Sequence, residues 1–166
     1  IASFRVRDVS TALGTSSGLI HYHFDTKERL VTAAFDYEAQ RQLAELERIE
    51  SSPASPAERL LDALTLYGPT GSALGWRLWI DAWSESLRNP GLRDTMEQVS
   101  TQWERRVTAL VAAKAEAEQR VVTRPQDVAA RLLAWIDGES VRIVLRASGR
   151  RELYGTHDLF HFCLGK

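Results

Sequence analysis

The sequence predicts an all-α protein, and three observations carry this prediction. Apolar residues recur three and four positions apart along almost the whole chain, which is the spacing of one face of an α-helix. No run alternates apolar and polar residues for long enough to indicate a β-strand. Of the 166 residues, 44% are hydrophobic and 26% are charged, so the chain can bury a globular core. We therefore expect a bundle of helices.

Two short helices are predicted at the N-terminal end. The first covers about 6–13 and is followed by Gly14, which stands where a left-handed residue would end a helix. Ser16 can cap the second, over about 17–24, through its side-chain oxygen. Only a tight turn separates the two helices.

A long amphipathic helix is predicted next, and a clear boundary follows it. Asp25 and Glu28 resemble a capping box that would start this connector helix. The segment 50–56, ESSPASP, holds two prolines and three serines and must interrupt it. We therefore expect an N-terminal part with its connector at 1–49, and a second domain at 50–166.

Further helices are expected in this second domain. Asn89 followed by Pro90 predicts a capped helix start, because Asn is a good N-cap and Pro is tolerated at the first helical position. The expected helices are at about 57–67, 73–87, 90–110, 125–147 and 156–164.

Residues 6–30 have the layout of a helix-turn-helix, which is a short helix, a glycine turn and a short helix with a polar face. A helix fits the major groove of DNA, its first residues reach base edges, and flanking polar groups hold phosphates. We expect small residues to read bases, and histidines, a tyrosine and a lysine to bind phosphate. The predicted DNA-binding residues are Ser16, Ser17, Gly18, Leu19, His21, Tyr22, His23 and Lys27.

These residues resemble the TetR family of bacterial regulators. The stretch 13–24, LGTSSGLIHYHF, followed by 26–30, TKERL, matches the family signature in spacing and residue type. The likeness continues at 89–93, NPGLR, and at 135–139, WIDGE, where similar members carry an Asn-Pro pair and a dimerisation helix. The resemblance implies a homodimer that binds a palindromic operator and joins through its C-terminal helices. It also implies that 1–49 is the DNA-binding region with its connector, and that 50–166 is a ligand-binding and dimerisation domain.

Four departures from the family pattern concern the N-terminal region. Ser10 and Thr15 replace residues that are usually alanine and valine, and both are small or isosteric. Arg5 stands where members place a capping Thr or Ser, so the helix can also start elsewhere, such as at Ser3. The family's first helix would precede Ile1, so the expected fold is a helix-turn-helix with its first helix apparently missing.

A tryptophan-rich stripe suggests an effector site. Trp76, Ile80, Trp83 and Leu87 share one helical face, and Trp79 lies at its margin. Such a stripe is equally compatible with a core and with a pocket, whose aromatic walls would favour a flat apolar or a cationic ligand. The predicted ligand-binding residues are Tyr67, Trp76, Trp79, Trp83, Trp103, Trp135 and Glu139.

Some candidate residues have plainer interpretations. Glu139 can anchor a cation, although an ion pair with Arg142, three positions on, is the favoured alternative. Residues two apart on a helix point about 200° apart, so His21 and His23 are not expected to share a metal. His157 and His161 share a face near Cys163, but dimer packing is favoured there over a metal site.

The remaining features favour a cytoplasmic regulator over an enzyme. We expect no cofactor and no metal, and we find no catalytic triad pattern, phosphate loop or paired carboxylates in a plausible cleft. A single cysteine indicates a reducing compartment, and no apolar run is long enough for a membrane span. A formal net charge of −1 means that any DNA contact must be local.

The sequence thus predicts a ligand-responsive transcriptional regulator. A repressor released from its operator by a small aromatic or apolar effector is the default mode. The alternative is a ligand-binding or interaction module of the same fold that does not bind DNA.

Overall fold

The computed structural model describes residues 5–68 and 74–145, and the described residues form helices and no strands. This confirms the all-α prediction. The helix expected at 156–164, with His157, His161 and Cys163, lies outside the described residues. The helices are α1 (Val6–Ala12), α2 (Ser17–Phe24), α3 (Lys27–Glu50), α4 (Pro56–Tyr67), α5 (Leu74–Ser86), α6 (Pro90–Ala117) and α7 (Pro125–Leu145).

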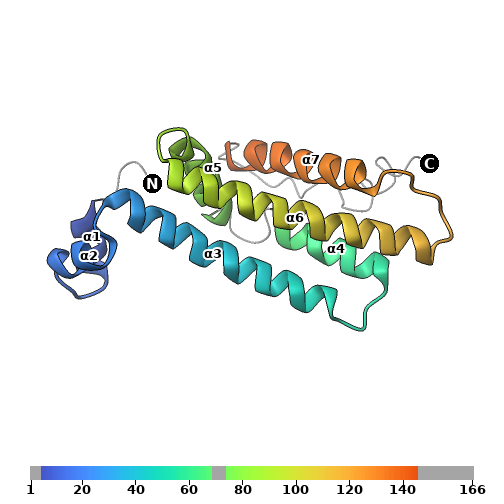
Figure 1. The fold of residues 1–166 in the computed structure, drawn as a ribbon, viewed down its shortest axis with the longest axis horizontal. Coiled ribbons are helices and arrows are strands. Elements are labelled where there is room, and N and C mark those ends of the chain that lie inside the picture. Colours follow the sequence, from blue (N-terminus) through green and yellow to red (C-terminus); the bar gives the residue numbers. More distant parts are fainter. Residues whose placement is uncertain (1–4, 69–73, 146–166) are drawn as a thin grey trace.

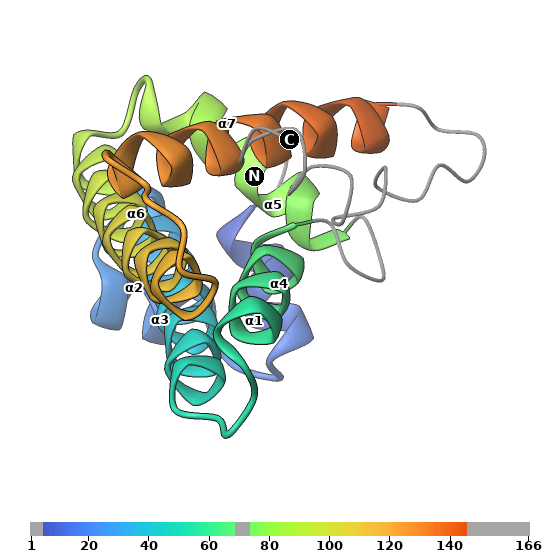
Figure 2. The same cartoon turned by 90° about the vertical axis from the view of Figure 1, so that its right-hand side faces the viewer.

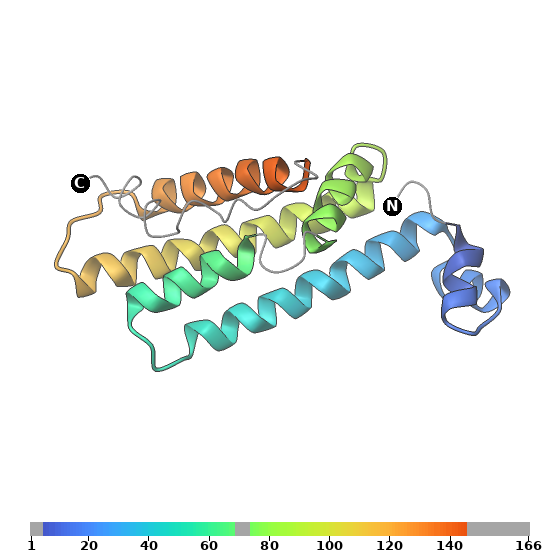
Figure 3. The same ribbon diagram turned by 180° about the vertical axis from the view of Figure 1, so that it is seen from behind.

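The molecule is elongated, with two short helices at one end (Figure 1). Helices α3, α4, α6 and α7 run along the long axis, whereas α1 and α2 form a small unit beyond the first turn of α3. Helix α5 crosses the bundle near the start of α6, at the end closer to that unit (Figure 3). The view along the bundle shows α4 and α7 on different sides of α6 (Figure 2). The arrangement places the small unit at one tip, attached through α3.

Side-chain caps define where most helices begin. Asn89 caps α6 with Pro90 in the first turn, as predicted, and Ser55 caps α4. The predicted cap of the connector is wrong by one residue. Asp25 ends α2 with a φ of 63°, and the side chain of Thr26 accepts the Arg29 amide at 3.2 Å instead. The connection is one residue longer than expected, because Asp25 ends α2 and Thr26, not Asp25, caps α3.

The first helix begins at Val6, with Arg5 as its N-cap in extended backbone conformation. The arginine side chain does not cap this helix. The Asp8 carboxylate takes over part of the role, because it accepts the Arg5 amide at 2.8 Å. The N-cap of this helix is therefore Arg5, at the position where family members place a capping Thr or Ser, and the alternative helix start at Ser3 is wrong.

Helix α6 is the central element of the core. Its residues Leu92, Val99, Trp103 and Val107 are at most 1% exposed. They belong to one apolar cluster with residues of α3, α4 and α7, and each fully buried side chain contributes about 1.5–3 kcal/mol. The principal partners from these helices are Leu46, Leu60, Leu132 and Ile136.

A polar contact ties the far end of the connector to this core. The Arg106 guanidinium of α6 donates to the Leu43 carbonyl at 3.2 Å and pairs with Glu50 at 3.1 Å. The last two turns of α3 are thus fixed to α6. The start of α3 and the two short helices extend away from this anchor (Figure 1).

Candidate nucleic-acid interface and effector site

The two short helices form a compact unit around a glycine turn. Gly14 has a φ of +62°, a conformation that L side chains rarely adopt, and this explains the residue at the turn. The Thr15 amide donates to the Ser10 carbonyl at 2.9 Å and closes the turn. Ile20 is 5% exposed and is the buried apolar residue of α2. The other side of α2 is therefore left to solvent.

A chain of hydroxyl groups joins α1 to α2. Ser10, which is 4% exposed, donates to the Arg7 carbonyl at 2.9 Å and lies 3.0 Å from the Ser17 hydroxyl. A hydroxyl has one hydrogen, so both bonds form together only when Ser17 donates to Ser10. The outward electron pairs of Ser17 then remain as hydrogen-bond acceptors.

Most predicted DNA-binding residues lie on the exposed side of α2. Gly18, His21 and His23 are exposed, Tyr22 is 83% exposed and Leu19 is 47% exposed. Ser16 caps the helix, since its side chain accepts the Leu19 amide at 3.1 Å. Ser17 and Lys27 are half-buried, and Lys27 is the first residue of α3. The structure thus brings these residues together at the free tip of the molecule (Figure 1).

Four aromatic side chains from three helices form a connected group, here called the aromatic cluster: Tyr67, Trp76, Trp83 and Trp103. The Tyr67 ring lies 4.9 Å from Trp103 and 6.3 Å from Trp76, and Trp76 lies 5.6 Å from Trp83. All three contacts are edge-on, the geometry that the aromatic quadrupole favours. Trp103 is almost completely buried, and its Nε1 has no hydrogen-bond partner in the described part of the chain.

A carboxylate borders the aromatic cluster. The Tyr67 hydroxyl donates to the Asp137 Oδ1 of α7 at 2.8 Å, across 70 positions of sequence. Burial raises the pKa of Asp137 above its ordinary value, and the hydrogen bond from Tyr67 offsets part of this effect. Burial and the nearby carboxylate raise the pKa of Tyr67, which therefore stays a hydrogen-bond donor. A partly buried acid beside aromatic faces can attract a cation.

Three other predicted ligand residues lie elsewhere. Trp79 packs edge-on against Phe35 of α3, with ring centroids 4.8 Å apart. Trp135 is half-buried against the core, and Glu139 pairs with Arg142 at 2.7 Å, the alternative that the sequence favoured.

The tryptophan stripe is shorter than predicted. Helix α5 ends at Ser86, and Leu87, expected on the apolar face, is 80% exposed. Because Leu87 follows the last helical residue, helical spacing no longer dictates its direction. The three tryptophans of the stripe remain within the helix.

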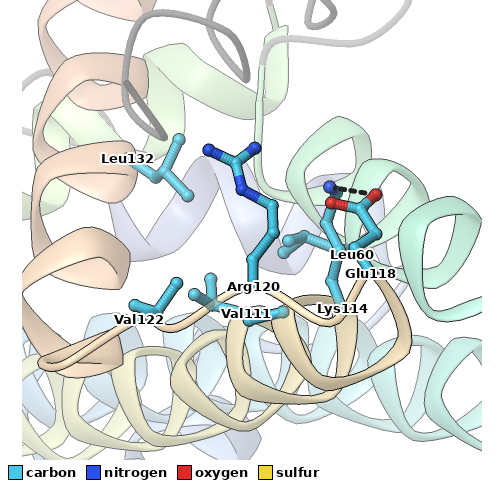
Figure 4. A pocket seen from close by; sticks show the side chains of 8 residues that line it. Leu60, Val111, Lys114, Glu118, Arg120, Val122 and Leu132 are labelled. Atoms are coloured by element: carbon cyan, nitrogen blue, oxygen red, sulfur yellow. Dashed lines mark hydrogen bonds and ion pairs between the residues drawn. The ribbon is translucent and has the colours of Figure 1, made fainter. Parts of the chain in front are cut away.

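Two hollows lie away from the aromatic cluster. The first, between α4, the end of α6 and α7, is bordered by Lys114, which pairs with Glu118 at 2.5 Å (Figure 4). Its enclosed space is about 10 Å³, which suits at most about one water. The second is an open groove of about 440 Å³ between the start of α3 and the start of α6, bordered by Thr32 and Asn89.

Within 5–68 and 74–145, no group of three or more His, Cys, Asp or Glu side chains is placed to hold a metal ion. Among the helices of those same ranges, none has the length and apolarity that a membrane crossing requires.

Sequence reasoning missed two residues of these sites. Asp137 lies four positions after the buried Leu133, at the edge of the apolar face of α7, and the sequence marks it only as part of the family likeness at 135–139. The contact with Tyr67 joins distant segments, so helical spacing does not predict it. Ser10 was noted only as a small replacement for alanine, whereas it holds Ser17 in place.

A two-helix unit with an exposed second helix, attached to a helical bundle, defines the class of helix-turn-helix regulators. The profile of the tetR family of bacterial regulatory proteins matches residues 1–34, and that of the BetI-type transcriptional repressor C-terminal domain matches 56–153. The chain therefore belongs to the TetR family of transcriptional regulators, with a BetI-type C-terminal domain. This confirms the family resemblance in the sequence.

Solved structures agree with this assignment. A transcriptional regulator from Saccharomonospora viridis in complex with choline has 26% identity and a TM-score of 0.82, over 95% of this chain and 83% of that chain. A TetR-family regulator from Rhodococcus sp. has 24% identity and a TM-score of 0.74, over 99% and 86%. A TetR regulator from Haloarcula marismortui has 21% identity and a TM-score of 0.76, over 87% and 77%. The search of curated proteins gave no match.

Proposed function

We propose that this regulator is a homodimeric repressor that leaves its operator when a small organic cation binds the bundle. Residues 1–49 would form the reading head and connector, and 50–166 the effector and dimerisation domain. The observation that carries this proposal is the contact between Tyr67 and Asp137, which places a carboxylate at the border of an aromatic cluster.

The chemistry of this site favours a quaternary ammonium ligand. Aromatic faces attract a cation through their quadrupole, and a trimethylammonium group also has apolar methyl surfaces that suit indole rings. A neutral aromatic effector, the default from sequence, would leave the Asp137 carboxylate without a charged partner. The choline found in the Saccharomonospora viridis regulator is of this chemical class and supports the proposal.

The reading head would use α2 in the major groove. Gly18 and Leu19 would approach base edges together with Ser17, while Tyr22 and Lys27 would bind phosphates. The exposure of Tyr22 and its place near the tip support these roles. A palindromic operator would match the two-fold symmetry of a dimer.

The outer face of α7 supports the proposed dimer contact. Ala130, Ala134 and Gly138 are exposed and recur four residues apart, so they form a strip of small side chains along the helix. A Cβ added to Gly138 would meet nothing within 4 Å in this chain. Such a surface permits close approach of a second helix, in agreement with dimerisation through the C-terminal helices.

Titration of the protein against an operator selected from a random DNA pool tests the proposal. We expect salt-sensitive binding to a palindrome, and we expect choline to weaken it. Calorimetry with choline alone separates the two activities. Choline binding without any sequence-selective DNA binding would favour the second candidate, a ligand-binding module, whereas DNA binding that choline leaves unchanged would refute the proposed effector class.

A further inference from the structure

One buried amide links the effector bundle to the start of the connector. Asn89 is 6% exposed and lies at the corner between α5 and α6. Its Oδ1 accepts the Leu92 amide at 3.1 Å and thereby caps α6. Its Nδ2 donates to the Glu28 carbonyl at 3.2 Å and to the Thr32 hydroxyl at 3.3 Å. A single side chain therefore holds two helices, each with a different atom.

The bonds on the α3 side act close to the reading head. Glu28 and Thr32 belong to the first two turns of α3, which follow α2 after only Asp25 and Thr26. An open groove lies beside these bonds, so apolar packing does not fill the junction at this point. Breaking them would leave a buried amide without partners, which is costly. The position of the first turns of α3 thus depends on where Asn89 lies.

Helix α5 connects the same corner to the aromatic cluster. Trp76 and Trp83 of α5 belong to the cluster, while Trp79 contacts Phe35, two turns along α3. After α5 ends, only Leu87 and Arg88 precede Asn89. A shift of α5 in response to a ligand would therefore be carried to α3 at two points, the ring contact and the amide.

We propose that Asn89 is a positioning residue that couples effector binding to the orientation of the reading head. Its cap holds it to α6, and its amide hydrogens hold the first turns of α3. This inference rests on the proposed function, because the coupling it describes joins the proposed effector and operator sites.

Two substitutions separate the cap from the coupling. Asn89→Asp and Asn89→Ser both keep a good capping oxygen for α6. Both remove the Nδ2 donor, the first by replacing it with oxygen and the second by shortening the side chain. Because only the first adds a charge, agreement between them excludes an effect of charge alone. Ser55→Ala is the matched control, because it removes the N-cap of α4. The cap bonds of Ser55 go to Glu58 and involve neither α3 nor the aromatic cluster.

The measurement is the ratio of operator affinities with and without choline, for an operator selected on the unmodified protein. We expect a ratio of about 5 to 150 in the unmodified protein, the usual range of allosteric coupling. Both Asn89 variants should reduce it to about 2 or less, with choline affinity in the absence of DNA nearly unchanged. Ser55→Ala should lower thermal stability but leave the ratio intact. An unchanged ratio in the Asn89 variants, or an equal loss in the Ser55 control, would overturn the proposal.

A second readout does not depend on choline. Operator binding should slow amide hydrogen exchange in residues 87–96 of the unmodified protein, and this protection should be lost in both Asn89 variants. Absence of a choline response combined with this pattern would refute the proposed effector and keep the role of Asn89. Equal protection in all variants would refute the role of Asn89 and leave the proposed function standing.

Discussion

Replacing Asp137 by asparagine tests the charge at the border of the aromatic cluster. The variant keeps an oxygen that can accept from Tyr67, as Asp137 does at 2.8 Å, so the local geometry is retained. Only the negative charge is lost. Coulomb's law with an effective dielectric constant of about 20 and a separation of about 5 Å gives an attraction of about 3 kcal/mol. Because solvent screens a carboxylate that is only partly buried, we expect choline affinity to fall by about tenfold to a hundredfold.

The assay is calorimetric titration of both proteins with choline and with its neutral carbon isostere. In the isostere a tert-butyl group replaces trimethylammonium, so its shape is retained without the charge. The isostere should bind the unmodified protein and the Asp137→Asn variant with the same affinity. An equal loss of affinity for both compounds would mean that the carboxylate acts through shape. Unchanged choline affinity would mean that its charge does not contribute, and either result would refute a charge interaction at this site.

Three further predictions concern pH, the reading helix and the hydroxyl chain. Because the folded protein raises the pKa of Asp137, it binds more protons than the unfolded chain between the ordinary and the raised pKa. The contribution of this residue to the unfolding free energy should therefore fall as pH rises through that window, while choline affinity rises. Denaturation measures the first trend and calorimetry the second, each from pH 4 to 8. In the Asp137→Asn variant, the dependence of stability and of choline affinity on pH should be flatter. Gly18→Ala should raise the free energy of unfolding by up to about 1 kcal/mol, because Gly18 is helical and an added Cβ would have only an ordinary contact at 3.7 Å. The same variant should bind the operator more weakly. Unchanged DNA affinity would show that Gly18 does not lie in the interface. Ser10→Ala should free the Ser17 hydroxyl to donate a hydrogen bond. A selection from random DNA should then show, at one position per half-site, a lower preference for bases with an exposed amino group. An unchanged preference would rule out Ser17 as a fixed acceptor.

Local signals predicted most helix limits because the residues that set them act within one turn. Ser16 and Asn89 cap the helices that the sequence assigned to them, and α2 spans the predicted residues. The error at Asp25 has a local origin too. Asp25 and Thr26 are both good caps, and only the backbone turn at the end of α2, with a positive φ at Asp25, selects Thr26.

The candidate effector site could be predicted only in part, because its contacts join distant segments. Helical spacing identified Trp76 and Trp83 but left the choice between core and pocket open. The sequence predicts Glu139 as the anion of the site, but in the structure Glu139 pairs with Arg142 on its own helix at 2.7 Å. Asp137 could not be selected from spacing, since its significance depends on Tyr67 three helices earlier in the chain.

The tryptophans of α5 contact different neighbours, and this explains why the sequence left the choice between core and pocket open. At 100° per residue, Trp76 and Trp83 lie about 20° apart on the helix, and Trp79 lies about 60° from Trp76. That difference is enough to direct the first two to the aromatic cluster and the third to Phe35 of the connector. A ligand that shifts the backbone at Trp76 or Trp83 would also shift Trp79, because a helix turn moves largely as one unit. The tryptophans of α5 therefore contact two different neighbours, and under the proposed function the link between the effector and the reading head would begin within a single turn.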